Sequence, residues 1–304
     1  MADATLAAPA RLTIHAPSGR VADLAALNLA ARRLRGLGFD ARVDETARGR
    51  HQRFAGDDAA RLEALHRVAR DGCDIALAAR GGYGLTRLLD RIDYALIGKS
   101  IDAGKRWVGH SDHTALQLAV LAHTKRPTWA GPLACYDFGR AEGVDEVTAG
   151  CFAEAMGGEL EAIGFRTETG FDGLQARGLL WGGNLCVLLS LLGTPHWPRV
   201  KGGILFLEDV NEHPYRVERM LLQLQQAGVL DAQKAVVLGD FGGWRKSPLD
   251  RGYNFKSVLA QLRGLTRTPI LTGLPFGHVP TKVCLPVGRR ATLLVDGRDV
   301  LIGW

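Results

Sequence analysis

The sequence predicts an α/β protein with an N-terminal, Rossmann-like domain and a smaller C-terminal α+β domain. Short apolar runs alternate with stretches whose apolar residues recur at helical spacing, which predicts a parallel sheet with helices on both faces. Polar and glycine-rich segments fall where apolar runs end, and ligands of such sheets bind at the carboxyl ends of the strands. We therefore expect an active site in the cleft between the two domains.

The length, composition and net charge of the sequence narrow the classes of function that the protein could serve. The 304 residues suit one large or two modest domains, and 46% hydrophobic residues suffice for a sizeable core. The net charge of +6 comes from dispersed Lys and Arg, so no nucleic-acid partner is expected. No stretch suits a membrane span, and residues 1–19 lack the pattern of a secretory signal.

Five cysteines are widely spaced and form no C-x-x-C pair. They are Cys73, Cys135, Cys151, Cys186 and Cys284. This pattern predicts neither a zinc site nor a disulfide framework, and it fits a reducing cytoplasm.

Strand and helix signals alternate in the first half. The near-continuous apolar run 74–79 is typical of a strand buried on both faces. The expected elements are strand 11–16, helix 21–34, helix 57–70, strand 74–79, a helix from Leu85, strand 105–109, helix 114–123 and helix 144–156.

The segment 157–173 is rich in Gly, Glu and Thr and is expected to be a linker between domains 1–156 and 174–304. In the second domain, WGGN at 181–184 leads into an apolar helix. The expected elements are helix 185–192, strand 203–207, helix 215–226, strand 235–238, helix 255–262 and strands 283–287 and 291–295.

Four polar residues, His110 to His113, separate an apolar strand from an apolar helix. A tight turn there would expose the Ser111 hydroxyl and aim the first free N–H groups of the helix at one point, where an oxyanion could form. The G-x-S-D pattern differs from the G-x-S-x-G elbow of α/β-hydrolases. The alternative is a helix cap by Ser111 or Asp112, and both roles are compatible if Asp112 caps and Ser111 is exposed.

Three other segments combine polar residues with strand ends or restrained loops. The glycines of RGGYG, residues 80–84, either let the backbone approach a ligand or form a simple loop, and they match no nucleotide-binding motif. Glu208 follows a buried strand and could orient a histidine or, with Asp209, cap the next helix. His278 lies in a restrained G-H-V-P loop, although a lone histidine is more often structural.

Together these segments resemble the LD-carboxypeptidase family of serine peptidases (muramoyltetrapeptide carboxypeptidases). The similarity rests on RGGYG, GHSDxTA, WGGNL followed by GTP, LEDVNEHPYRVERMLLQL and GLPFGH, in the family's order from Pro17 to the C-terminal strands. The long LEDVNEHPYRVERMLLQL block makes the resemblance specific. Two residues, His110 and His113, stand where relatives commonly carry apolar or aromatic residues.

The resemblance implies a Ser–Glu–His triad and an oxyanion hole, with no metal or organic cofactor. The residues carried over by motif are the triad Ser111, Glu208 and His278 and the backbone N–H donors Asp112 and either Gly81 or Gly82. Arg80 borders the glycine loop and is a candidate for binding a substrate carboxylate.

The implied reaction is release of the terminal D-alanine from the murein tetrapeptide L-Ala-γ-D-Glu-meso-diaminopimelate-D-Ala, free or on a muropeptide, during peptidoglycan recycling. Relatives are often homodimers. Three alternatives stay open: a microcin-immunity-type peptidase that acts on peptidyl or aminoacyl nucleotides with the same triad, a non-catalytic peptide-binding protein, and a cysteine hydrolase. The last would need a Gly-x-Cys-x-Gly elbow, which the sequence lacks.

Overall fold

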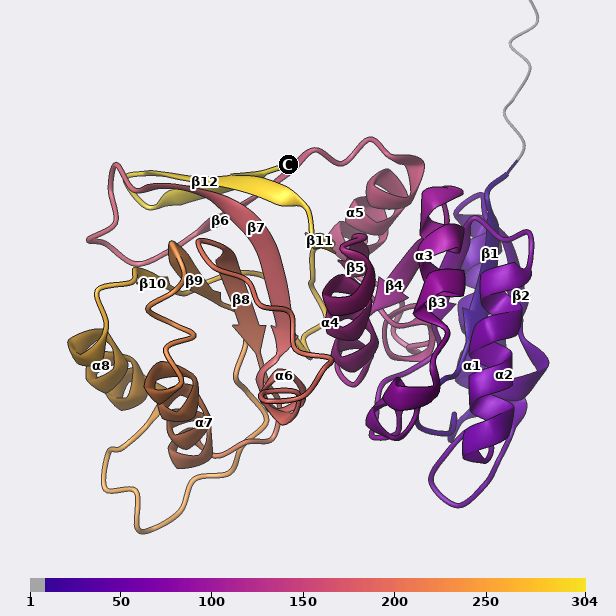
Figure 1. Cartoon of the computed structure of the whole chain (residues 1–304), viewed down its shortest axis with the longest axis horizontal. Helices are drawn as coiled ribbons and strands as arrows, with labels where there is room; N and C mark the ends of the chain where they lie inside the picture. The colour runs from indigo at the N-terminus through magenta and orange to yellow at the C-terminus, as the bar shows by residue number, and fades with distance from the viewer. Residues whose placement is uncertain (1–8) are drawn as a thin grey trace, which may run out of the picture.

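The computed structural model of the chain describes residues 9–304 and contains two sheets (Figure 1). Residues 1–8, part of the segment expected to lack a secretory signal, lie outside the described residues. The predicted fold class is confirmed: a mainly parallel N-terminal sheet with helices on both faces, and a C-terminal mixed sheet with its own helices. Among the described residues, no helix is both long and apolar enough to cross a membrane.

The N-terminal sheet places the two polar loops side by side. Its parallel strands are β1 (Arg11–His15), β2 (Asp40–Val43), β3 (Ile75–Ala78), β4 (Arg106–Gly109) and β5 (Thr128–Ala130), in the order β5-β4-β3-β1-β2. All four residues of β3 are buried, as its apolar run predicts. Because β3 and β4 pair directly, the RGGYG loop after β3 and the HSDH turn after β4 lie at the same edge.

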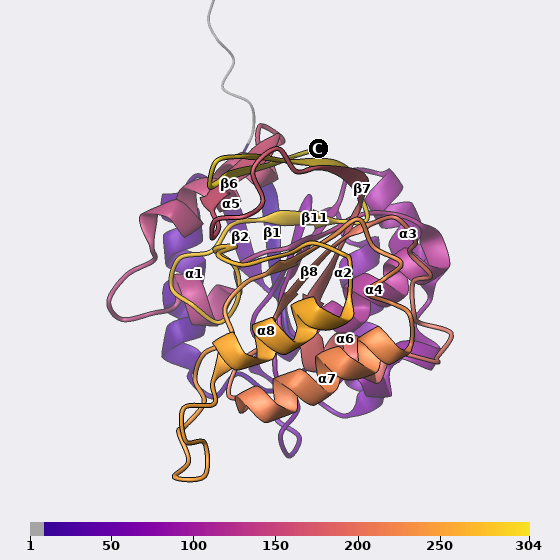
Figure 2. The same cartoon turned by 90° about the vertical axis from the view of Figure 1, so that its left-hand side faces the viewer.

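Helices cover both faces of this sheet, α1 and α5 on one face and α2, α3 and α4 on the other (Figure 2). Their bounds are α1 Leu24–Gly36, α2 Asp58–Arg70, α3 Tyr94–Asp102, α4 His113–Thr124 and α5 Glu146–Gly157. Four of these helices begin with an aspartate whose carboxylate accepts a first-turn N–H: Asp23, Asp57, Asp93 and Asp145. Helix α4 is the exception, because the side chain of Asp112 makes no cap hydrogen bond.

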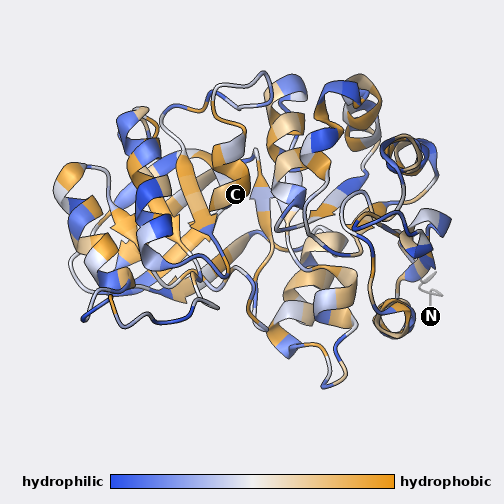
Figure 3. Ribbon diagram, turned by 90° about the horizontal axis from the view of Figure 1, so that it is seen from below, coloured by the Kyte–Doolittle hydropathy of each residue, from blue (hydrophilic) through white to orange (hydrophobic). Residues whose placement is uncertain are grey.

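The C-terminal sheet is parallel on one side and antiparallel on the other. Its order is β10-β9-β8-β7-β12-β13-β6, parallel from β10 to β7 and antiparallel from β7 to β6. Its elements are β6 (Ala162–Arg166), β7 (Gln175–Asn184), α6 (Leu185–Ser190), β8 (Ile204–Glu208), α7 (Pro214–Gln226), β9 (Ala235–Leu238), α8 (Phe255–Leu265), β10 (Ile270–Leu271), β12 (Arg290–Asp296) and β13 (Asp299–Gly303). Several of its strands are strongly hydrophobic, whereas its helices carry polar residues as well (Figure 3).

Two strands depart from the expected domain boundaries 1–156, 157–173 and 174–304. The expected linker contains β6, which pairs with β13 at the edge of the C-terminal sheet. Strand β11 (Leu285–Val287), far along the second domain, pairs antiparallel with β5 and completes the N-terminal sheet. The chain therefore crosses back to its first half, and the proposed boundaries do not separate the two sheets.

The periodicity of the sequence left several elements unpredicted, most of them short. Helix α3 and strands β2, β5, β6, β7, β10 and β13 had no expected counterpart. The helix expected from Leu85 is two 3-10 turns, Leu85–Arg87 and Leu89–Arg91, and α3 begins only after the Asp93 cap. Strands of two to five residues carry too few positions to show a period, and the ten-residue β7 is interrupted by three glycines. In contrast, α2, α4 and α5 match the expected ranges within two residues.

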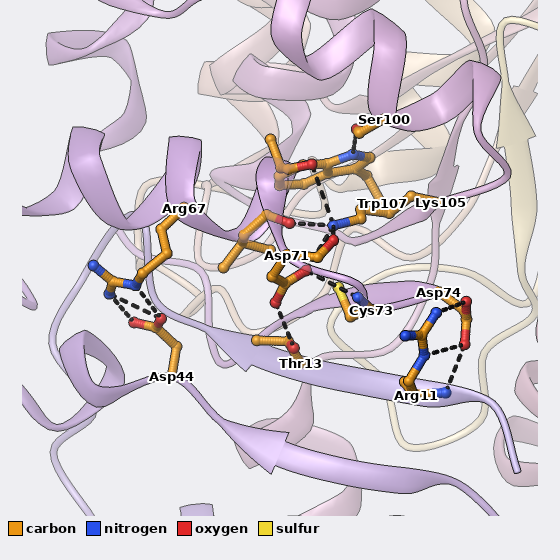
Figure 4. A network of polar contacts seen from close by, with 12 residues as sticks. Arg11, Thr13, Asp44, Arg67, Asp71, Cys73, Asp74, Ser100, Lys105 and Trp107 are labelled. Atoms are coloured by element: carbon orange, nitrogen blue, oxygen red, sulfur yellow. Dashed lines mark hydrogen bonds and ion pairs between the residues drawn. The ribbon is translucent and has the colours of Figure 1, made fainter.

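A buried lysine fastens α2 to the N-terminal sheet (Figure 4). The Lys105 Nζ donates to the carbonyl oxygens of Val68, Ala69 (3.4 Å) and Asp71 (3.0 Å), and to Oδ1 of Asp71 (2.7 Å). These carbonyls lie at the C-terminal end of α2, where no further helical N–H can satisfy them and where a positive charge is favoured. The Asp71 carboxylate also accepts from the hydroxyl of Thr13 (3.1 Å), so the contact reaches strand β1.

Replacing this ammonium should destabilise the fold. Lys105→Met keeps the aliphatic stem but leaves the Asp71 carboxylate and the helix-end carbonyls without their donor, and we expect the free energy of unfolding to fall by about 1–3 kcal/mol. Lys125→Met is the matched control, since the exposed Lys125 also donates to a helix carbonyl, that of Ala122 (2.8 Å). Urea unfolding should show a change within about 0.5 kcal/mol for the control. Equal effects of the two substitutions would contradict this role of Lys105.

Candidate active site

The turn between β4 and α4 presents Ser111. Its backbone adopts φ +62°, a left-handed conformation that non-glycine residues rarely take and that costs about 1–3 kcal/mol. The carbonyl of Ser111 accepts the N–H of Thr114 (2.9 Å), which starts the helix directly behind it. Ser111 is partly exposed while His110 and Asp112 on either side are buried. This backbone conformation therefore exposes Ser111 to solvent and leaves its two neighbours buried.

The RGGYG loop lies against this serine. A Cβ atom added to Gly81 would lie 2.6 Å from the Oγ of Ser111 and 3.4 Å from the backbone N of Asp112, so only glycine fits there. Gly82 has φ +83°, which also favours glycine. Among the hydrogen bonds of the described residues, none is donated by a backbone N–H of residues 80–83. These N–H groups are thus available to a ligand beside the serine hydroxyl.

The carboxylate of Asp112 turns away from its own helix, so the expected helix cap is wrong. Its Oδ2 accepts the backbone N–H of Leu85 (2.9 Å), just beyond the glycine loop. Burial raises the pKa of Asp112, while hydrogen bonds from the N–H groups of Leu85 and Gly84 and from the Ser18 hydroxyl oppose that rise. The Asp112 carboxylate, which could have capped α4, instead accepts hydrogen bonds from the backbone of the glycine loop.

A buried carboxylate orients the histidine. Glu208, the last residue of β8, has no exposed surface, and its Oε2 accepts from Nδ1 of His278 (2.8 Å). Because a carboxylate only accepts, Nδ1 carries the proton and Nε2 is left as a proton acceptor. Burial lowers the pKa of His278, but the hydrogen bond and charge of Glu208 outweigh it, and the pKa is raised. The alternative in which Glu208 and Asp209 cap α7 is wrong, since His213 caps that helix.

Sequence reasoning missed the role of Asn184. Its side-chain amide donates to Oε1 of Glu208 (3.1 Å) and to Oδ1 of Asp209 (3.0 Å), and its backbone N–H donates to Oγ1 of Thr114 (3.1 Å). A Cβ on Gly183 would lie 2.5 Å from that same Oγ1, so glycine permits the close approach. Burial and the charge of Glu208 raise the pKa of Asp209 to about 6. The only signal in the sequence was an asparagine after two glycines at a strand end.

The loop that carries His278 is held by the first half of the chain. The Tyr136 hydroxyl donates to the carbonyl oxygen of His278 (3.0 Å). Lys282 and Asp137 form an ion pair with almost no exposed surface, and the Lys282 Nζ lies 5.0 Å from the centre of the Tyr136 ring. The rings of His110 and His278 are 5.0 Å apart at 73°. Because His110 precedes Ser111, the structure brings the imidazole of one half beside the serine turn of the other.

Arg80 is engaged with its own loop. Its Nη1 donates to the carbonyl oxygen of Arg20 (2.8 Å), and its guanidinium lies over Gly82. The expected contact of Arg80 with a substrate carboxylate stays a prediction. Within residues 9–304, no group of three or more His, Cys, Asp or Glu side chains is arranged to hold a metal ion.

A hollow of about 430 Å³ opens between the two halves beside Asp112. Tyr83 of the glycine loop lines one side, and Cys186 and Val187 at the start of α6 line the other. Its walls are mainly apolar with hydroxyl groups from Thr86 and Ser190. Ser111, Glu208 and His278 are not among its lining residues, so the expected location of the active site in a cleft between the halves stays a prediction.

Comparisons with known proteins identify related sequences and structures. The family model described as the LD-carboxypeptidase N-terminal domain matches residues 12–131, and that of the C-terminal domain matches residues 177–293. A probable murein peptide carboxypeptidase of Bacillus subtilis is 32% identical over 88% of this chain and 83% of the relative. The murein tetrapeptide carboxypeptidase of Pseudomonas aeruginosa is 29% identical over 93% and 92% of the two chains.

Solved structures show the same similarity. The crystal structure of muramoyltetrapeptide carboxypeptidase from Oxalobacter formigenes superposes with a TM-score of 0.87 at 40% identity, over 96% of this chain and 97% of that one. The MccF protein in complex with glutamyl sulfamoyl guanosine shares the fold, with a TM-score of 0.86 over 98% and 97% of the chains at 21% identity. With both family models matched in order and a relative above 30% identity along most of its length, this chain belongs to the LD-carboxypeptidase family.

Proposed function

We propose that the protein is a serine-type LD-carboxypeptidase that removes the terminal D-alanine from murein tetrapeptide. The observation that carries the proposal is the pair of buried Glu208 and partly exposed His278 beside the strained Ser111 turn, with the glycine loop against the Ser111 hydroxyl. The substrate class is taken from relatives that are named for murein peptides. Function in peptidoglycan recycling, a cytoplasmic location and a homodimeric assembly are predictions from the family resemblance.

The reaction would proceed by acyl transfer. Nε2 of His278 takes the proton of the Ser111 hydroxyl as Oγ attacks the carbonyl carbon of the diaminopimelate residue, and Glu208 stabilises the imidazolium. The oxyanion accepts hydrogen bonds from the N–H of Asp112 and from that of Gly81 or Gly82. The imidazolium then protonates the amine of the leaving D-alanine. Water, deprotonated by the same imidazole, attacks the ester and regenerates the serine.

The substrate is anionic, and the net charge of +6 would favour its encounter with the enzyme. We assign Arg80 to the substrate carboxylate only as the cation that borders the glycine loop. If Arg80 gave up its contact with the Arg20 carbonyl to bind a substrate carboxylate, its guanidinium would have to move.

Loss of the nucleophile should abolish turnover. Ser111→Ala should fold as the wild type and release alanine from L-Ala-γ-D-Glu-meso-diaminopimelate-D-Ala at least about 10⁴-fold more slowly, since the triad acts as a unit. Mass spectrometry of the products measures the release. The control is Thr124→Ala, which removes a hydroxyl that donates to the carbonyl oxygen of Val120 in its own helix, at the end of α4 opposite the serine turn.

Retained activity in Ser111→Ala would eliminate Ser111 as the nucleophile. The same assay with an aminoacyl sulfamoyl adenylate distinguishes the second candidate class. Turnover of that compound alone would replace the murein substrate with a nucleotide conjugate while leaving the triad in place.

The pH dependence should report the Glu208–His278 pair. The neutral imidazole is the base, so activity falls as the pH drops through the pKa of His278, and the raised pKa puts this acid limb above about pH 6.5. Glu208→Gln removes the charge that raises the pKa, so the limb should move to lower pH while kcat falls about 10²–10⁴-fold. Profiles of kcat/KM against pH for both proteins measure the shift. An unmoved limb would show that another group titrates.

A further inference from the structure

The side chain of Asp112 connects the serine turn to the glycine loop. Its backbone N–H belongs to the oxyanion site of the proposed function, but its carboxylate points elsewhere, to the Leu85 N–H at 2.9 Å. The neighbouring N–H of Gly84 and the hydroxyl of Ser18 also act on this carboxylate. With 4% of its surface exposed, Asp112 is one of the few charged residues buried in the N-terminal half. A buried acceptor with only donors around it holds those donors in place.

Arginines also hold both ends of the loop, including the end that Asp112 contacts. Fully buried Arg61 donates from Nη1 to the carbonyl oxygens of Gly84 (2.9 Å) and Pro17 (2.8 Å). Arg80 donates to the carbonyl oxygen of Arg20 (2.8 Å). These two arginines tie the two ends of the loop to the segment that follows β1. Within residues 9–304, the Asp112 carboxylate alone links the loop to the serine turn through a hydrogen bond.

The spacing between loop and turn leaves little tolerance. The backbone of Gly81 approaches Ser111 so closely that even a methyl group would overlap its hydroxyl at 2.6 Å. An oxyanion bound to Ser111 would need the N–H of Asp112 and the loop N–H within about 2.7–3.1 Å at the same time. A shift of the loop by about 1 Å would break one of these two contacts while leaving the substrate's other contacts intact.

We propose that the Asp112 carboxylate is a positioning residue for the oxyanion site, setting the distance between the glycine loop and the nucleophile turn. The inference rests on the proposed function for the identity of the nucleophile, but it does not depend on the substrate. It assigns two tasks to one residue: the backbone N–H of Asp112 contacts the oxyanion, and its side chain holds the second donor at the matching distance.

The test compares Asp112→Asn with wild type. The amide has the same shape but one accepting oxygen, and its NH₂ group would face the loop donors. We expect the second-order rate of Ser111 labelling by a fluorophosphonate to fall about 10–100-fold, because the probe's phosphoryl oxygen occupies the oxyanion site. For the peptide substrate, kcat should fall by a similar factor while KM changes less than about threefold. Asp57→Asn, the same change at an exposed cap of α2, should label at the wild-type rate.

Ser18→Ala provides a second, milder variant. It removes one donor to the carboxylate without altering the oxyanion donors, and we expect a two- to fivefold loss in labelling rate. Thermal unfolding identifies a variant that fails to fold, and Ser18→Ala then decides the question. Wild-type labelling rates in both folded variants would overturn the proposal, as would a rise in KM with unchanged kcat.

The labelling assay separates this inference from the proposed function. If the wild type is labelled at Ser111 yet leaves murein tetrapeptide intact, the substrate is wrong while the variant rates still test Asp112. If the fluorophosphonate does not label Ser111 at all, the nucleophile assignment and this inference fall together.

Discussion

A carboxylate with no exposed surface governs the arrangement of the site. Burying the charge of Glu208 is tolerable only when donors replace the lost water, since an unpaired buried carboxylate is very costly. The two donors come from separate segments, the Asn184 amide at the end of β7 and the His278 imidazole in the loop after β10. Satisfying one charge therefore brings three parts of the C-terminal half to one point. Asn184 extends the chain of contacts to α4, directly behind the serine.

The buried ion pair between Lys282 and Asp137 positions the loop that carries His278. Replacing such a pair by apolar groups is often neutral, whereas removing one partner costs about 3–5 kcal/mol. The pair thus favours one docking position of the loop over others more than it adds net stability. Tyr136, next to Asp137, binds the backbone of His278 and lies under the Lys282 ammonium. The imidazole is consequently set by contacts with both halves, Glu208 from one side and the Tyr136–Asp137 segment from the other.

The sequence predicted the features that repeat along the chain and missed those that form across it. The apolar run of β3 and the helical spacing of apolar residues in α2 and α4 predicted those elements. The family motifs pointed to Ser111, Glu208 and His278, whereas the residues alone favoured a helix cap at the serine turn and a structural role for His278. Asp112 has the composition of an N-cap, and only the folded loop shows that the Leu85 N–H competes for it. The role of Asn184 in the site was not predicted either, because the partners that give it this role, Glu208, Asp209 and Thr114, are 24, 25 and 70 residues away.

Strand β11 has a consequence for how this architecture can be inherited. The chain leaves the His278 loop and immediately adds a strand to the sheet that was built at the start of the sequence. A recombination event between two relatives that joined the first half of one to the second half of the other would seat a foreign strand against β5. It would also seat a foreign loop against Tyr136 and Asp137. The two halves are therefore expected to diversify as a single linked unit, and modular shuffling of either half would be selected against.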